Sequence, residues 1–182
     1  MRTARASSTP AVAELGAVDV LVNNAGVGAA VPATHETREE FTRVLDVNVT
    51  GSFLMARTCA RVMRPGSSVV NVGSILGSTT AGMPQAAYCS SKAAVIGLTR
   101  DLAQQWGGRR GIRVNAVAPG FFASEMTDEY PDGYLDSMLG RVPLGRMGDA
   151  DEIANAVIFL ASDAASYVTG ALLPVDGGLL VN

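Results

Sequence analysis

Residues 18–26 read Val-Asp-Val-Leu-Val-Asn-Asn-Ala-Gly, a short apolar run that is followed at once by two amides, an alanine and a glycine. An apolar run bounded by residues that favour turns is typical of a buried strand in a parallel sheet. We therefore predict a strand over 18–22 that ends in a turn at its carboxyl end.

Similar apolar runs recur along the chain and are separated by stretches in which apolar residues have helical spacing. The predicted strands are 18–22, 68–72, 112–118 and 171–175. The predicted helices are 37–63, 85–106 and 151–160, with a kink at Gly51 in the first and Asp149 as N-cap of the last. The alternation predicts an α/β fold, with a parallel sheet covered by helices on both faces, in a single domain over 1–182.

The connection over 121–148 is much longer than the usual loop of about 2–6 residues between a strand and a helix. It carries several aromatic and methionine side chains. We expect a functional lid with short helices in this connection.

Composition excludes several classes of function. The 182 residues hold 14 Lys+Arg and 17 Asp+Glu, a net charge of −3, without a basic cluster that a nucleic-acid binder would need. No apolar run approaches a membrane span, so we expect no membrane partner. Only 17% of residues are charged, which favours a surface that is partly covered by other subunits or by ligand.

Cysteine and histidine usage argues against a metal site. Cys59 and Cys89 form neither a disulfide framework nor a metal-ligand spacing, so a reducing, cytoplasmic location is the simplest expectation. His35 is the only histidine and lies in a polar stretch, where we expect a solvated loop residue. We expect the start, Met1 to Ala13, to be a loose lead-in, because it lacks the apolar segment of a secretion signal.

Polar and glycine residues directly follow three of the predicted strands. Asn24-Ala25-Gly26, Gly73-Ser74 and Pro119-Gly120 each lie just past a carboxyl end. Ligands bind along this edge in open parallel sheets. Any strand must end in some turn, but three such ends together favour one shared site.

The sharpest chemical pattern is Tyr88-Cys89-Ser90-Ser91-Lys92. Tyr88 and Lys92 are four residues apart at the start of a predicted helix, so their side chains share a face. A phenol with a pKa near about 10 is a poor acid or base at neutral pH, and a nearby ammonium lowers that pKa. The pair predicts a general acid/base tyrosine; the alternative is an ordinary pair on a helix surface.

Two more polar residues support the catalytic interpretation. Ser74 lies at a strand end, well placed to hydrogen-bond a substrate oxygen. Asn48 lies between two valines in a predicted helix, an apolar context in which an unpaired amide is unfavourable. The alternative for Asn48 is a surface position or a residue that kinks the helix.

In order and spacing, these residues resemble the classical short-chain dehydrogenases/reductases. The motifs are Asn23-Asn24-Ala25-Gly26, Asn48, Ser74, Tyr88-x-x-x-Lys92 and Pro119-Gly120, and the resemblance extends from about Glu14 to Gly178. The nearest group contains 3-oxoacyl-carrier-protein reductases, glucose dehydrogenases and gluconate 5-dehydrogenases. The resemblance implies the C-terminal part of a doubly wound, three-layer α/β/α Rossmann fold that binds NAD or NADP.

The resemblance also implies a catalytic tetrad of Asn48, Ser74, Tyr88 and Lys92. Hydride would pass between the nicotinamide and a secondary alcohol or ketone, while Tyr88 exchanges the proton of the substrate oxygen and Ser74 holds that oxygen. Lys92 would lower the pKa of Tyr88 and bind the nicotinamide ribose. Asn48 would hold a water that links Lys92 to solvent.

The remaining site residues are expected in binding roles. Beside Tyr88 and Lys92, the resemblance places along the cofactor Asn24, Ala25, Gly26, Pro119, Gly120 and Ser124. Beside Ser74, we expect on the substrate side Leu76, Met83, Phe121, Phe122 and Met126, with simple packing as the alternative for each. This apolar lining disfavours a highly charged substrate. The resemblance further implies a homotetramer or dimer in which helices 37–63 and 85–106 pair across one interface.

One motif of the family is missing from the sequence. The family begins with a strand, a T-G-x-x-x-G-x-G turn and a helix N-terminus that cradles the pyrophosphate, whereas Gly16 is the only glycine before Asn23. About 60 residues are expected to be absent, including the one that selects NAD or NADP. Strand 18–22 would then be an exposed apolar edge, so we expect marginal stability or reliance on oligomerisation.

Three explanations for the missing motif remain open. The chain is a shortened version of a full-length dehydrogenase, or a genuine short paralogue that keeps the tetrad, or a non-catalytic fragment or assembly subunit that keeps the fold. The first is favoured, and the intact tetrad argues against the last. Epimerase or dehydratase chemistry is a smaller alternative within the family.

Overall fold

The computed structural model describes residues 12–14, 16–123, 130–131 and 133–181. Its centre is a four-stranded parallel sheet in the order β1-β2-β3-β4. The strands are β1 (Val20–Asn23), β2 (Ser68–Val72), β3 (Arg113–Pro119) and β4 (Leu172–Val175). Each overlaps one of the predicted strands, which confirms the predicted α/β fold with a parallel sheet.

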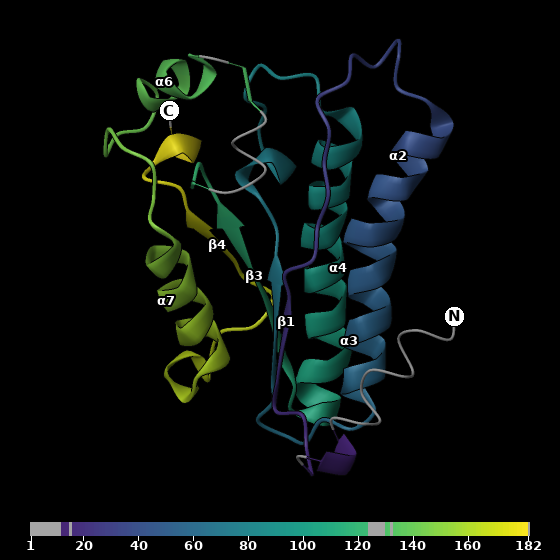
Figure 1. The fold of residues 1–182 in the computed structure, drawn as a ribbon. Coiled ribbons are helices and arrows are strands. Elements are labelled where there is room, and N and C mark those ends of the chain that lie inside the picture. Colours follow the sequence, from purple (N-terminus) through teal and green to yellow (C-terminus); the bar gives the residue numbers. More distant parts are fainter. Residues whose placement is uncertain (1–11, 15, 124–129, 132, 182) are drawn as a thin grey trace.

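Helices cover both faces of this sheet, as predicted. The described helices are α2 (Arg38–Leu45), α3 (Ser52–Ala60), α4 (Ala86–Arg110), α6 (Tyr134–Leu139) and α7 (Ala150–Ala161). Shorter helical turns are η1 (Asp46–Gly51), η2 (Ile75–Gly77), η3 (Asp163–Ala165) and η4 (Leu179–Val181). Helices α2, α3 and α4 lie on one side of the sheet and α7 lies on the other, so the fold has three layers (Figure 1).

The prediction of one helix over 37–63 is wrong in its detail. Thr37 caps α2 through a reciprocal pair of hydrogen bonds with Glu40, but the α-helix gives way to a π-helical turn, η1, that ends at Gly51. The turn is rich in β-branched residues and ends in glycine, all weak helix formers. The expected kink is therefore a whole π-turn that carries Asn48, and α3 stops at Ala60.

Two apolar clusters hold the helices on the sheet. On the side of α3 and α4, the buried residues are Ala56, Cys59, Ala60, Met63, Val69, Leu102, Ala103, Ile112 and Val114. On the side of α7, they are Val70, Val117, Leu160 and Ala165. The first cluster contains Leu102 and Ala103 of α4 and so holds that helix, with its Tyr88–Lys92 turn, against the sheet.

Helix α4 is longer than predicted at its C-terminal end. It continues to Arg110 and stops at Gly111, which adopts a left-handed conformation with φ of 64°. A side chain at Gly111 would also come within 3.0 Å of Pro65. Glycine is therefore required for this helix to turn back into β3.

Strand β1 forms an open apolar edge in the described part of the chain. It pairs with β2 on one side, and its Leu21 packs toward α3 and α4. On the opposite face Val20 is 45% exposed and Val22 is 41% exposed, because α7 packs over β2, β3 and β4. This confirms the exposed edge expected from the sequence; whether it makes the chain depend on oligomerisation stays a prediction.

Substitution of Val22 by lysine tests whether this edge drives self-association. We expect Val22→Lys to reduce oligomer or aggregate formation in sedimentation velocity, because an edge charge disfavours further strand pairing. The free energy of unfolding should change by no more than about 0.5 kcal/mol, since the side chain is exposed. Ile158→Lys, at an exposed position on α7, is the matched control; equal sedimentation of all three proteins as monomers would contradict the expectation.

Candidate active site

The carboxyl ends of the strands open into a cleft of about 520 Å³. Eleven residues singled out from the sequence line it: Asn24, Gly26, Gly73, Ser74, Leu76, Tyr88, Lys92, Pro119, Gly120, Phe121 and Phe122. Three strand ends and the start of α4 therefore do converge on one site.

Ser74 and Tyr88 meet from two different elements. Ser74 follows β2, is 7% exposed and caps η2 by accepting a hydrogen bond from the Leu76 N–H at 3.1 Å. Tyr88 lies in the first turn of α4, and its hydroxyl hydrogen-bonds the Ser74 side chain. The two hydroxyls thus form one polar spot in a largely apolar wall.

Lys92 lies one helical turn beyond Tyr88 and is the only lysine in the sequence. Its side chain is 5% exposed, and its Nζ donates to the Val72 carbonyl at 2.9 Å. The same nitrogen lies 5.5 Å from the centre of the Tyr88 ring. An ammonium has three donors, so two remain for groups in the cleft.

The electrostatics of this pair differ from the expectation that Lys92 lowers the pKa of Tyr88. Burial raises the Tyr88 pKa to about 12, against a smaller lowering by the hydrogen bond with Ser74. Burial also lowers the Lys92 pKa to about 8. The physical reason is that both side chains lose water, and desolvation disfavours the charged form of each.

Asn48 lies behind the cleft rather than in its lining. It is 1% exposed, and its side chain makes a reciprocal pair of hydrogen bonds with the Val27 backbone, at 2.8 Å to N–H and 2.9 Å to C=O. Its amide also donates to the Ser91 hydroxyl at 2.8 Å, which in turn donates to the Tyr88 carbonyl at 2.7 Å. Asn48 therefore ties the segment after β1 to the helical turn that carries Tyr88.

Gly26 and Gly28 allow the segment after β1 to approach Lys92 and Tyr88 closely. A Cβ at Gly26 would lie 3.4 Å from the Lys92 Nζ, and a Cβ at Gly28 would lie only 2.8 Å from the Tyr88 ring. Any larger residue at Gly28 would push the ring away from its place. Close backbone approach thus shapes one wall of the cleft.

The other wall comes from the long connection predicted over 121–148, which contains the short helix α6. The rings of Phe121, Tyr134 and Tyr130 form two edge-to-face pairs, with centroids 6.1 and 5.1 Å apart. The Tyr134 hydroxyl donates to the Ala81 carbonyl at 2.8 Å. This bond joins the connection to the loop after β2; a lid function stays a prediction.

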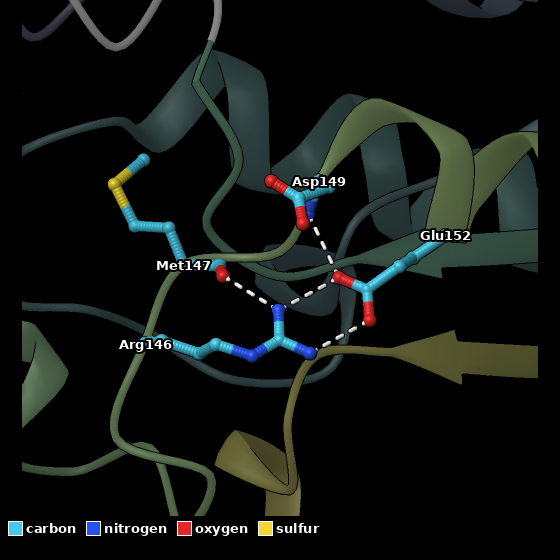
Figure 2. Close-up of polar contacts among 4 residues, drawn as sticks. All are labelled: Arg146, Met147, Asp149 and Glu152. Atoms are coloured by element: carbon cyan, nitrogen blue, oxygen red, sulfur yellow. Dashed lines mark hydrogen bonds and ion pairs between the residues drawn. The ribbon is translucent and has the colours of Figure 1, made fainter.

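An ion pair holds the end of this connection against α7. The Arg146 guanidinium donates two hydrogen bonds of 2.8 Å to the Glu152 carboxylate and a third of 3.0 Å to the Met147 carbonyl (Figure 2). Glu152 also accepts from the N–H of Asp149, the predicted N-cap of α7. These hydrogen bonds lower the Glu152 pKa to about 2.

Not every expected site residue can be placed in the cleft. Ala25 and Met83 lie outside its lining, and Ser124 and Met126 lie outside the described residues. The lining residues that sequence reasoning missed are Val72, Ile75, Tyr130 and Ile153. Val72 and Ile75 adjoin the Gly73-Ser74 strand end, a local signal, whereas Tyr130 and Ile153 arrive through the tertiary fold.

Comparison with known proteins agrees with this geometry. Residues 3–180 match the family model described as enoyl-(acyl carrier protein) reductase. A 3-oxoacyl-[acyl-carrier-protein] reductase of Thermotoga maritima is 42% identical over 173 residues, which cover 93% of this chain and 69% of that protein. The chain belongs to the short-chain dehydrogenase/reductase family. The family resemblance read from the sequence is thereby confirmed.

Other members of the short-chain dehydrogenase/reductase family are longer than this chain. An uncharacterised member of Sinorhizobium fredii is 48% identical over 166 residues, which cover 88% of this chain and 30% of that protein. The crystal structure of a gluconate 5-dehydrogenase of Burkholderia cenocepacia, in complex with NADP and tartrate, superposes with a TM-score of 0.91 at 33% identity, over 98% of this chain and 71% of that chain. The chain thus spans 30% to 71% of these relatives.

Three further observations concern the residues that the structure describes. They contain no group of three or more His, Cys, Asp or Glu side chains that could hold a metal ion. None of their helices is long and apolar enough to cross a membrane. Cys59 and Cys89 are free thiols there, and His35 is exposed.

Removal of the Asn48 side chain tests its structural role. Asn48→Ala deletes three buried hydrogen bonds and leaves the Val27 backbone unpaired, so we expect a loss of about 2–4 kcal/mol in the free energy of unfolding. The Val27 amide should also exchange its hydrogen faster. The control is Asn155→Ala, at an exposed position on α7; equal stability of both variants would contradict the role given to Asn48.

The Lys92 pKa is directly measurable, because one lysine gives one Cε signal in carbon NMR. We expect a titration midpoint near 8 in the folded chain and a return to about 10.4 in denaturant. Since the folded pKa lies below the unfolded one, the buried ammonium destabilises the fold below pH 8. This destabilisation should fade as the pH rises from 8 to about 10.4. A folded-state midpoint as high as in denaturant would show that Lys92 is solvated.

Proposed function

We propose that this chain carries the catalytic part of an NAD(P)-dependent oxidoreductase that interconverts a secondary alcohol and a ketone. The observation that supports it is the convergence of Ser74, Tyr88 and Lys92 in one cleft at the carboxyl ends of the strands. A hydroxyl pair and a buried amine at this place suit a substrate oxygen that must be held while its proton moves.

The cleft fits the nicotinamide end of the cofactor. Lys92 has two N–H donors left for ribose hydroxyls, and Gly26 leaves the backbone without a side chain beside the Lys92 Nζ. NAD(P), when bound, supplies or accepts the hydride. Asn24 and Pro119 would adjoin the cofactor on either side. The described residues contain no glycine-rich turn for the pyrophosphate, so this proposal concerns the nicotinamide end, with NAD or NADP left open.

Tyr88 acts as the acid when a ketone is reduced. With a pKa of about 12 it is protonated at neutral pH, and its O–H can be given to the oxygen that becomes a hydroxyl. Ser74 has one O–H, and with substrate bound it would donate this hydrogen to the same oxygen instead of to Tyr88, which stabilises the charge that develops there. The reverse reaction needs a phenolate, which the neighbouring Lys92 ammonium favours.

Asn48 supports the reaction from behind the cleft. Both hydrogens of its side-chain amide are already donated, to Val27 and Ser91, so a water that relays protons to Lys92 would have to donate to an Asn48 oxygen. Such a water could return a proton to the amine after each turnover. The Asn48 side chain itself keeps the segment after β1 in place.

The proposal also includes the cellular location and the oligomeric state of the protein. We place the protein in the cytoplasm as a homotetramer or dimer, with 1–182 as a single partial Rossmann domain. Its low content of charged residues supports subunit contacts. The relatives bear the names of a keto-acyl reductase and a gluconate dehydrogenase, which supports alcohol/ketone chemistry on a small molecule.

Calorimetric titration and a tyrosine variant together test the function. We expect NADH or NADPH to bind saturably to the chain and Tyr88→Phe to bind it equally well. Turnover of a ketone should fall by at least about 100-fold in Tyr88→Phe, since the proton donor is lost while the ring remains.

Circular dichroism and thermal unfolding of Tyr88→Phe provide the folding control. Turnover retained in a folded Tyr88→Phe would refute the acid/base assignment. Absence of cofactor binding to a folded wild-type chain would instead favour a non-catalytic fragment or assembly subunit.

A further inference from the structure

A second cavity adjoins the cleft on the side of β4 and α7. It measures about 490 Å³, within the range of small-molecule sites. Its walls come from the end of the long connection, the carboxyl end of β4 and the turn that follows β4. Six of its fourteen lining residues are aliphatic and two are phenylalanines; the aliphatic ones are Val142, Pro143, Leu144, Pro174, Val175 and Val181.

Phe121 and Phe122 line both this cavity and the cleft. The Phe122 ring lies against Gly148, where a Cβ would come within 2.2 Å of a ring carbon. The Gly148 N–H donates to the Phe121 carbonyl at 3.0 Å, and Phe122 and Gly148 form an isolated parallel β-bridge. The two phenylalanines thus form a fixed wall that the cleft and the cavity share, so a ligand that spans both would lie against their side chains.

The charged groups around the cavity are already paired within the chain. Arg146 and Glu152 bind one another through two hydrogen bonds (Figure 2). The Asp176 carboxylate accepts from the N–H groups of Gly178 and Leu180, at 3.0 and 2.9 Å. A charged ligand would have to break these pairs, whereas an uncharged apolar group would find ready contacts.

We propose that this cavity binds the apolar tail of the substrate, whose oxygen is held in the cleft by Ser74 and Tyr88. The substrate class is then a secondary alcohol or ketone with an uncharged aliphatic chain of several carbons on one side of the oxygen. This inference rests on the proposed function, because the cleft must hold the oxygen for the tail to reach past Phe122.

A series of linear methyl ketones from 2-butanone to 2-octanone tests the tail site. Dissociation constants are measured by NMR on the methyl groups of the protein. In the wild type we expect affinity to rise about fourfold for each added methylene that enters the cavity. The longer ketones, but not 2-butanone, should shift the Val142 and Val181 methyl signals.

Leu144→Trp fills the cavity from its rim, since Leu144 is 67% exposed and its replacement leaves the core intact. This variant should bind 2-butanone like the wild type, but its affinity should no longer rise with the chain length of the ketone. Ile158→Trp, on α7 at a position 62% exposed that lines neither cavity, is the matched control and should keep the gain.

Three outcomes would overturn the inference. The gain with chain length could persist in Leu144→Trp, which would place the tail elsewhere. Binding of 2-octanone could depend on Leu144 but be unchanged in a Ser74→Ala variant, which would make the cavity a separate site. Leu144→Trp could change the oligomeric state in sedimentation and leave the gain unchanged, which would make the cavity a subunit interface.

Failure of the tail site and failure of the proposed function are distinguishable. Cofactor binding and ketone turnover that show no dependence on tail length would reject the tail site alone. Absence of both would reject the alcohol/ketone function, and the tail site with it.

Discussion

The amide of Asn48 is the contact on which the geometry of the cleft depends. Buried in a π-turn, it pairs with both backbone groups of Val27 and with Ser91. This clamp, together with the bridge between Val31 and Gln85, holds the segment after β1 over the Tyr88–Lys92 turn. A regular α-helix through this region would leave the amide facing a different direction, so the irregular turn is what makes the contact possible.

The strands and the polar residues at their ends were readable from the sequence because each depends on local pattern. Apolar runs that stop at Asn24, Gly73 or Pro119 define both the strand and the edge where ligands bind. The π-turn at Asn48 was only partly readable, since Gly51 signals a weak helix but not the number of residues in the turn. Tyr130 and Ile153 were not readable as cleft residues, because only the packing of the long connection and α7 brings them there.

The pKa values of the site also depend partly on residue spacing, which the sequence shows, and partly on burial, which it does not. Residue spacing places Lys92 beside Tyr88, but how much water each side chain keeps depends on the whole fold. In the structure, burial opposes ionisation of both groups, so proximity alone does not predict the net pKa of Tyr88, and a lowering by Lys92 stays a prediction. The Arg146–Glu152 pair, at the other end of the site, keeps its charges because it lies at the surface. It thereby fixes the long connection without adding a charge to the cleft.

The presence of a single lysine has a practical consequence for chemical labelling. Apart from the chain's N-terminal amine, Lys92 offers the only primary amine to acylating reagents, cross-linkers or aldehyde surfaces, and it lies 5% exposed at the base of the cleft. Coupling through amines would therefore attach the protein through one end and in one orientation. An amine-specific reagent small enough to enter the cleft would modify Lys92 alone among the side chains. The fraction of modified Lys92 would therefore measure the fraction of molecules whose cleft is accessible to the reagent.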